Sequence, residues 1–238
     1  MIKIKYKKAS HVGVVLSFVI FITFLIFLYS ILEPALKTQK DKQAILDSLK
    51  IKLIKNFSAD LTTTSINLEK GVVSCFEIEQ ISGVSVLNSI VKDRFDNLVN
   101  SFPKSGNLQI DPKSANNKFF KIFYSSEFNE SENLGSCDFI DSDNYLRGFS
   151  KTKEYVFEKK IIEIKELMAD ENFYEIFKQN LGISIGNEFG FSFTNNIGEI
   201  IGTKEKNIST NIYVEEIPIQ YVNNEANINS GKLNIRVW

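Results

Sequence analysis

The chain has 238 residues, of which 43% are hydrophobic and 24% charged, and its formal net charge at pH 7 is −1. Four of the 28 Lys and Arg residues lie within the first 32 positions, so the other 24 face 29 Asp and Glu and give the rest of the chain a net charge of −5. There is no basic stripe, which argues against a nucleic-acid-binding protein. The roughly 200 residues beyond position 32 suffice for one substantial core or two small ones.

The N-terminal part pairs a basic head with a long uncharged run. The head, residues 1–11, contains four lysines, and residues 12–32 form 21 positions without a charged side chain. At 1.5 Å per helical residue the run covers about 31 Å, the thickness of a bilayer's hydrocarbon core. We therefore expect a transmembrane helix, with membrane lipid as its first partner. Because the lysines precede the run, the positive-inside rule keeps the N-terminus in the cytoplasm and places the C-terminal domain outside the cell membrane.

A cleaved secretory signal is the alternative interpretation of this run. Such signals have an apolar region of about 7–15 residues that ends at a small-residue A-x-A site. Here the apolar run is longer, and the sequence Leu32-Glu33-Pro34-Ala35 offers no such site. We expect the run to remain as an anchor.

Residues 33–58 predict a second helical stretch with one apolar face. Leu46, Leu49, Leu53 and Phe57 recur at spacings of three, four and four, which places them on one side of a helix. Pro34 suits either the first turn of a new helix or a kink. The apolar face of this stalk needs something to pack against.

Residues 59–238 predict an exterior α+β domain, rich in strands and with one or two helices. Residues 69–71 are expected to turn the chain between two strands, and residues 84–99 fit either a helix or a strand. A loop is expected at 101–117, and helix at 151–181 with Gly182 as its C-terminal cap. Strands are expected at 61–68, 72–78, 119–124, 189–193, 197–201, 212–222 and 233–238.

Covalent features fall on the predicted outer side. Cys75 and Cys137 form an even pair, which in an oxidising compartment suggests one disulfide; two buried free thiols are the alternative. Their spacing excludes a CxxC redox motif. Asn56, Asn129 and Asn207 each begin an N-x-Ser sequence and are candidate glycosylation sites.

Catalytic and metal-binding patterns are largely missing. The single histidine, His11, lies at the membrane edge, so the exterior domain lacks a Ser-His-Asp arrangement and any histidine ligand. Asp138, Asp141 and Asp143 resemble the start of a calcium loop, but Leu146 replaces its required glycine, which favours a solvated acidic turn. We expect a non-enzymatic protein with no cofactor, no metal and no identifiable small-molecule substrate.

The N-terminal residues carry a family resemblance. The run Lys7-Lys8-Ala9-Ser10-His11-Val12-Gly13 is followed by an apolar helix, an amphipathic continuation and a β-rich domain. This arrangement resembles type IV pilin-like proteins, and archaeal members with class III signal peptides look most similar. The resemblance implies processing around Lys8, Ala9 and Ser10, and packing of the apolar helices into a central bundle. Gly13 stands about where the family commonly has a glutamate.

Helix packing has its own sequence signal. Gly13 and Ser17 are small residues four positions apart, a spacing that lets helices approach closely in lipid. We expect the helix-packing residues to be this pair together with Leu46, Leu49, Leu53 and Phe57.

The expected function is that of a pilin-like subunit of a surface filament or secretion machine, assembling with like or related subunits through its N-terminal helix. One alternative is a single-pass, membrane-tethered exterior domain that binds a ligand or an envelope partner. Another is an anchored hydrolase whose carboxylates no spacing rule singles out.

Overall fold

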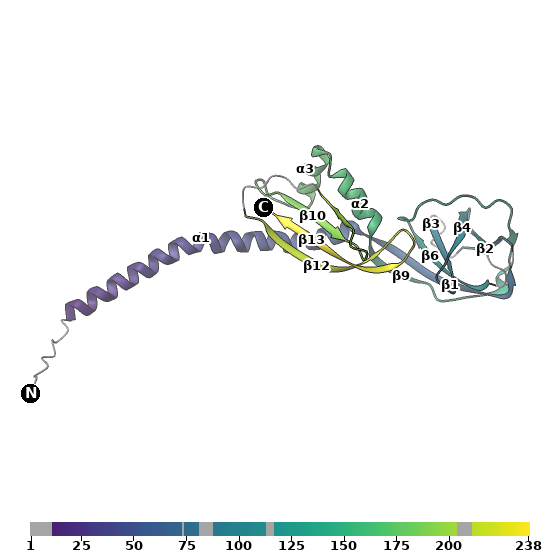
Figure 1. Ribbon diagram of the computed structural model, residues 1–238, viewed down its shortest axis with the longest axis horizontal. Coiled ribbons are helices and arrows are strands. Elements are labelled where there is room, and N and C mark those ends of the chain that lie inside the picture. Colours follow the sequence, from purple (N-terminus) through teal and green to yellow (C-terminus); the bar gives the residue numbers. More distant parts are fainter. Residues whose placement is uncertain (1–10, 73, 81–87, 113–116, 204–210) are drawn as a thin grey trace, which may run out of the picture.

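The computed structural model describes residues 11–72, 74–80, 88–112, 117–203 and 211–238. The molecule is elongated: one long helix leads into a lobe of helices and strands, and a second, all-β lobe lies at the far end (Figure 1). We call these the proximal and distal lobes. The fold is α+β, as expected, with an N-terminal apolar helix and a β-rich domain.

Helix α1 (His11–Phe57) is one continuous element of 47 residues, about 70 Å long at 1.5 Å per residue. The two predicted helical stretches are therefore joined. The helix continues through Pro34 and bends along its length (Figure 1). Pro34 is therefore not the start of a new helix, although a proline inside a helix removes one backbone hydrogen bond.

Strand β1 (Ser58–Val72) begins at the residue after α1 ends, and its 15 residues run from the proximal into the distal lobe. The predicted turn at residues 69–71 was wrong, because these residues lie inside β1. Residues 58–63 of β1 pair with β9 (Lys151–Phe157), and residues 62–72 pair with β6 (Asn117–Ser125). The pairing with β6 is interrupted by an irregularity between residues 67 and 72.

The strands form one pairing path in the order β11-β10-β13-β12-β9-β1-β6-β3-β4-β5-β2-β7, and β8 pairs with β1 beside it. All pairs are antiparallel except β9 with β12 and β2 with β7. The distal strands are β2 (Phe76–Glu79), β3 (Asn88–Asp93), β4 (Leu98–Lys104), β5 (Asn107–Asp111), β7 (Asp138–Phe139) and β8 (Tyr145–Arg147). The proximal strands are β10 (Phe189–Thr194), β11 (Ile200–Gly202), β12 (Tyr213–Val222) and β13 (Ile228–Val237).

The distal lobe differs from the sequence prediction in two places. Residues 88–93 and 98–104 are strands, so the helical alternative for 84–99 was wrong; residues 81–87 lie outside the described residues. The loop predicted at 101–117 is largely the hairpin of β4 and β5. Its turn, Ser105-Gly106, has both φ angles positive (44° and 91°), the geometry that suits a two-residue hairpin.

The helix predicted at 151–181 is three elements. Its first seven residues form β9, because β1 offers them a strand partner and tertiary pairing overrides local preference. Helices α2 (Glu158–Leu167) and α3 (Glu171–Asn180) follow. The Asp170 side chain caps α3 by accepting from the Phe173 amide at 2.8 Å. Gly182, at φ +73°, and Ile183 donate back to the last turn of α3, confirming the predicted glycine cap.

The proximal core lies between one face of a sheet and a layer of helices. Alternate residues of β10, β12 and β13 are buried on the inner face, as expected for strands with one solvated side. The helix layer contributes the apolar stripe of α1 with side chains from α2 and α3. Buried members include Leu49, Leu53, Phe57, Ile161, Phe177, Phe191, Ile219, Leu233 and Ile235.

Two further clusters lie along β1. Leu61, Phe128, Phe157, Val222 and Ala226 form a small core where the lobes meet, which we call the waist. The distal core is larger and is built on strands β1 to β6 and β8. Its buried members include Ile66, Leu68, Phe76, Ile78, Val91, Leu108, Ile110, Phe120, Ile122 and Tyr124.

Replacing Leu53 tests whether the α1 stripe belongs to this core. Leu53 is 0% exposed, so Leu53→Ala should lower the free energy of unfolding by about 2–5 kcal/mol. Ile51 lies on the same helix but is 69% exposed, and Ile51→Ala should change it by no more than about 0.5 kcal/mol. The single tryptophan, Trp238, lies against β10 in the proximal lobe, so its fluorescence during denaturation in detergent reports this unfolding. Equal effects of the two variants would contradict the assignment.

Candidate functional site

The N-terminal half of α1 is uncovered. Val12–Glu33 is long and apolar enough to cross a membrane, and no part of it is buried by the rest of the chain. Apolar side chains point outward all around it, for example Phe18 and Phe27, each more than 60% exposed. Soluble monomers rarely expose so large a contiguous apolar surface. This segment therefore needs lipid or other helices around it.

The C-terminal part of α1, from about Lys42 onward, is covered along its apolar stripe by the chain itself. Leu46, Leu49, Leu53 and Phe57 are at most 1% exposed and lie in the proximal core. The stripe thus finds its packing partner in its own domain and is not available to a second subunit. N-terminal of the stripe the helix surface is open, and Leu36 there is 55% exposed.

Lysines along α1 fix its orientation on the proximal lobe. Lys50 forms an ion pair with Glu215 of β12 at 3.0 Å, and Lys52 donates to the Leu181 carbonyl at 2.6 Å. Lys42 donates to the side chain of Asn187. Helix and lobe therefore form one body from about residue 42 onward.

The small pair lies on the uncovered half. Gly13 and Ser17 are both exposed, and a side chain added at Gly13 would meet nothing within 4 Å. The predicted processing residues Lys8, Ala9 and Ser10 lie outside the described residues. Of His11 only the backbone, at the start of α1, is described.

Two of the three candidate glycosylation residues are described, and both are exposed. The Asn56 amide donates to the Lys52 carbonyl in the last turn of α1, at 2.8 Å. Asn129 lies in the segment between β6 and β7. Asn207 lies outside the described residues.

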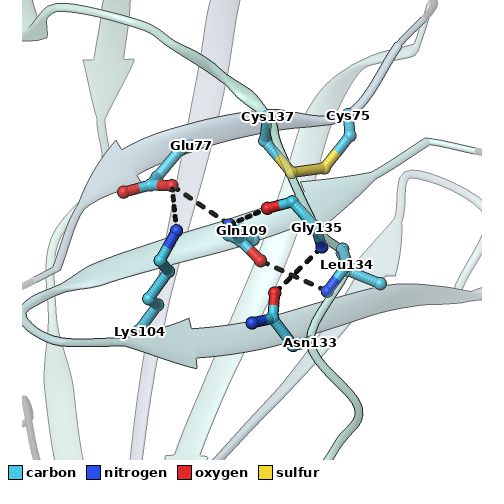
Figure 2. Close-up of a disulfide and its surroundings, with 8 residues drawn as sticks. All are labelled: Cys75, Glu77, Lys104, Gln109, Asn133, Leu134, Gly135 and Cys137. Carbon is cyan, nitrogen blue, oxygen red and sulfur yellow. Dashed lines mark hydrogen bonds and ion pairs between the residues drawn. A yellow bond between two sulfur atoms is a disulfide. The ribbon is translucent and has the colours of Figure 1, made fainter.

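The disulfide prediction is confirmed: Cys75 and Cys137 are bonded, with their Cα atoms 4.9 Å apart. Beside the bond, the fully buried Gln109 of β5 holds the segment that leads to Cys137 (Figure 2). Its amide donates to the Gly135 carbonyl at 3.0 Å, and its carbonyl accepts from the Leu134 amide at 3.3 Å. The cysteines were readable from the sequence, but no sequence signal singles out Gln109.

Glu77 of β2 is the anionic centre of this network. Asn107 donates to it at 2.6 Å, Gln109 at 3.2 Å, and the Lys104 ammonium lies 3.9 Å away (Figure 2 shows the last two). The hydrogen bond from Asn107 is the largest influence and lowers the pKa of Glu77 below its ordinary value of 4.5. Partial burial opposes this shift, while Gln109 and Lys104 add to it.

Another titratable cluster joins α3 to β10. Tyr174 donates to the Glu188 carboxylate, and Lys178 forms ion pairs with Glu188 at 2.8 Å and with Glu175 at 3.2 Å. Burial, and then the bond to Glu188, raise the pKa of Tyr174. These groups bond to one another and hold α3 on the sheet, which accounts for them structurally.

The acidic turn shows no assembled ligand set. Asp138, Asp141 and Asp143 are all exposed. Within the described ranges, no three His, Cys, Asp or Glu side chains converge closely enough to hold a metal ion.

No family model, no curated protein and no solved structure matches this chain.

Removing the disulfide should weaken the distal lobe selectively. The bond closes a loop of 62 residues, and the loss of such a bond typically costs about 2–5 kcal/mol. In a Cys75→Ala/Cys137→Ala variant, hydrogen exchange should accelerate in β2, β5 and β7 and remain unchanged in β10, β12 and β13. Unchanged protection throughout, or a uniform loss, would contradict a local role.

The Glu77 network predicts a stability loss in acid. A carboxyl group whose folded-state pKa is lowered stabilises the fold fully above its unfolded pKa, and this contribution is lost as the pH falls through the folded pKa. Here the loss should occur below about pH 4.5. Asn107→Ala should raise the pKa of Glu77 in an NMR titration, whereas Asn144→Ala, at an exposed asparagine of the same lobe, should not. An unshifted pKa in Asn107→Ala would refute the assigned cause.

Proposed function

We propose that this protein is a membrane-anchored, pilin-like subunit without enzymatic activity, which assembles with like or related subunits through the uncovered half of α1. The observation that carries the proposal is the division of α1. One half is apolar and uncovered, and the other half is the core helix of the proximal lobe, with no linker between them.

The alternative, a tethered binding domain, needs only a span and a linker of any flexibility. In this chain the helix is continuous and its C-terminal half is embedded, so the direction of the apolar segment is tied to that of the domain. Such coupling is of use when the helix surface itself must meet other helices in a defined geometry. The architecture therefore favours assembly over simple tethering.

The assembly surface suits packing in an apolar environment. Between helices in lipid, van der Waals contact replaces the hydrophobic effect, and small residues allow the closest approach. Gly13 and Ser17 lie on one face, because residues four apart are neighbours on a helix. A repeated contact between different faces of identical subunits produces a helical filament when the rotation between them does not close into a ring.

The proposed topology places the lysine-rich head in the cytoplasm and both lobes outside the cell membrane. A disulfide-bonded domain is consistent with an oxidising compartment. Because residues 7–13 resemble the N-terminal region of type IV pilin-like proteins, we also propose cleavage near Lys8, Ala9 and Ser10.

Substitutions on the small-residue face test the proposal. Gly13→Leu and Ser17→Leu should each reduce the recovery of high-molecular-weight assemblies from the native host at least tenfold, because a large side chain keeps the helices apart. Val15→Leu is the matched control, since residue 15 points away from that face, and it should assemble as the unchanged chain does. All three variants should remain in the membrane fraction.

N-terminal mass spectrometry of the native protein provides an independent readout. A start at Ser10 or His11, together with assemblies lost in Gly13→Leu and Ser17→Leu, is the expected result. An intact N-terminus on a monomeric membrane protein, unaffected by either substitution, would overturn the proposal in favour of the tethered domain.

A further inference from the structure

A cleft of about 430 Å³ lies at the waist, within the size range of small-molecule sites. Four parts of the chain line it: β3, β4, the segment between β6 and β7, and the turn between β12 and β13. We call it the waist cleft. It lies far from the uncovered half of α1, so its chemistry is separate from the proposed assembly.

Two buried hydroxyl groups among the lining residues of the waist cleft have no hydrogen bond to the described part of the chain. Ser89 is 4% exposed, and its Oγ and that of Ser131 are buried without a hydrogen bond among the described residues. Buried hydroxyls are nearly always bonded, because losing water without a replacement is unfavourable. The exposed amides of Asn100, Asn129 and Asn224 complete the polar lining.

In a neighbouring cleft, by contrast, several asparagine side chains form hydrogen bonds within the protein. That cleft, of about 660 Å³, shares Asn224 of the β12–β13 turn with the waist cleft and is also rich in asparagine. There Asn195, Asn196 and Asn223 are engaged in hydrogen bonds that shape turns and bind Tyr221. These three amides are engaged within the fold, whereas Asn100 and Asn129 of the waist cleft are exposed.

The walls of the waist cleft are held in place. Asn88 donates to the Phe128 carbonyl at 2.9 Å, and Gln109 holds Leu134 and Gly135 (Figure 2). On the opposite wall, Lys92 donates to Asn227 in the β12–β13 turn. A preformed wall reduces the entropy that a ligand must lose on binding.

The lining chemistry selects the ligand class. Hydroxyl and amide groups both donate and accept, and they alternate here with the aliphatic side chains of Leu98, Val99 and Leu134. Neither Lys nor Arg lines the cleft, and Glu132 is the one carboxylate among its lining residues, so the lining suits neither an anion nor a metal cation. We propose that the waist cleft binds a neutral saccharide, whose hydroxyls would meet the exposed amides of the asparagines and whose C–H faces would meet the aliphatic groups.

The saccharide could come from two sources. One source is a glycan that is not attached to this chain. The other is a glycan attached to Asn129 itself, since Asn129 lines the cleft and begins the sequence Asn129-Glu130-Ser131. Attachment would join the sugar C1 to Nδ2 of Asn129, with loss of a proton from that nitrogen and release of the lipid phosphate of an activated lipid-linked donor.

Saturation-transfer NMR on the full chain in detergent tests the proposal. The probes are glucose, galactose, mannose, N-acetylglucosamine and their β-linked dimers, offered to the native protein and to Asn129→Gln. Asn100→Leu and Asn224→Leu should each weaken binding at least tenfold. Asn180→Leu makes the same change at an exposed residue of α3, far from the waist cleft, and should leave binding unchanged.

Each outcome supports or overturns the site. Binding to both the native protein and Asn129→Gln assigns an external glycan. Binding to Asn129→Gln alone, with added sugar mass on native Asn129, assigns the chain's own glycan. No binding to either form, or binding that Asn100→Leu and Asn224→Leu leave intact, overturns the proposal.

Discussion

The junction between Phe57 and Ser58 constrains the rest of the molecule. Helix α1 ends at one residue and β1 begins at the next, so no loop absorbs a rotation between them. Phe57 is fully buried in the proximal core and packs edge-on against Phe191, which fixes the last turn of the helix. Farther along β1, Leu61 lies in the waist core and Ile66 lies in the distal core. One continuous piece of backbone therefore links the uncovered helix to every core of the protein, and its buried side chains at successive positions fix the direction of each lobe.

Because the backbone is continuous, the length of the exposed part of α1 sets the distance between the apolar segment and the proximal lobe. From Glu33 to Lys42 the described side chains are charged, polar or exposed, and the lobe begins to contact the helix only near Lys42. Nine helical residues span about 14 Å, more than the headgroup layer of one leaflet. A span in the bilayer would thus hold the proximal lobe clear of the lipid surface. The same interval would leave room for neighbouring helices to pack before the bulk of each domain intervenes, which is the geometry that the proposed assembly through α1 requires.

Most of the correct sequence predictions came from the local periodicity of apolar residues. The stripe of Leu46, Leu49, Leu53 and Phe57 and the alternation in β12 follow from the periods of helix and strand, and both match the structure. The errors arose where a distant partner decides the outcome. Residues 151–157 have a helical neighbourhood but pair with β1, about 90 positions earlier. The loop predicted at 101–117 contains Pro103 and Gly106, yet the first lies in a strand and the second in a tight turn. The waist cleft was beyond prediction for the same reason, because Ser89, Asn129 and Asn224 meet only through the topology of the sheet.

The waist is also where the two lobes depend on each other. The turn between β12 and β13 belongs to the proximal sheet, but it buries Ala226 in the waist core and receives a hydrogen bond from Lys92 of β3. Ala226 has a φ of +57°, an unusual conformation for a residue with a side chain, and Asn223 supports it by accepting from the amides of Glu225 and Asn227. Reversing the chain does not by itself account for this strained conformation. The buried contact of Ala226 in the waist core explains it better. Since the same turn presents Asn224 to the waist cleft, the contact that aligns the lobes also sets the width of the cleft. Any relative movement of the lobes would change that width, and the cleft is therefore coupled to the alignment that the helix and β1 impose.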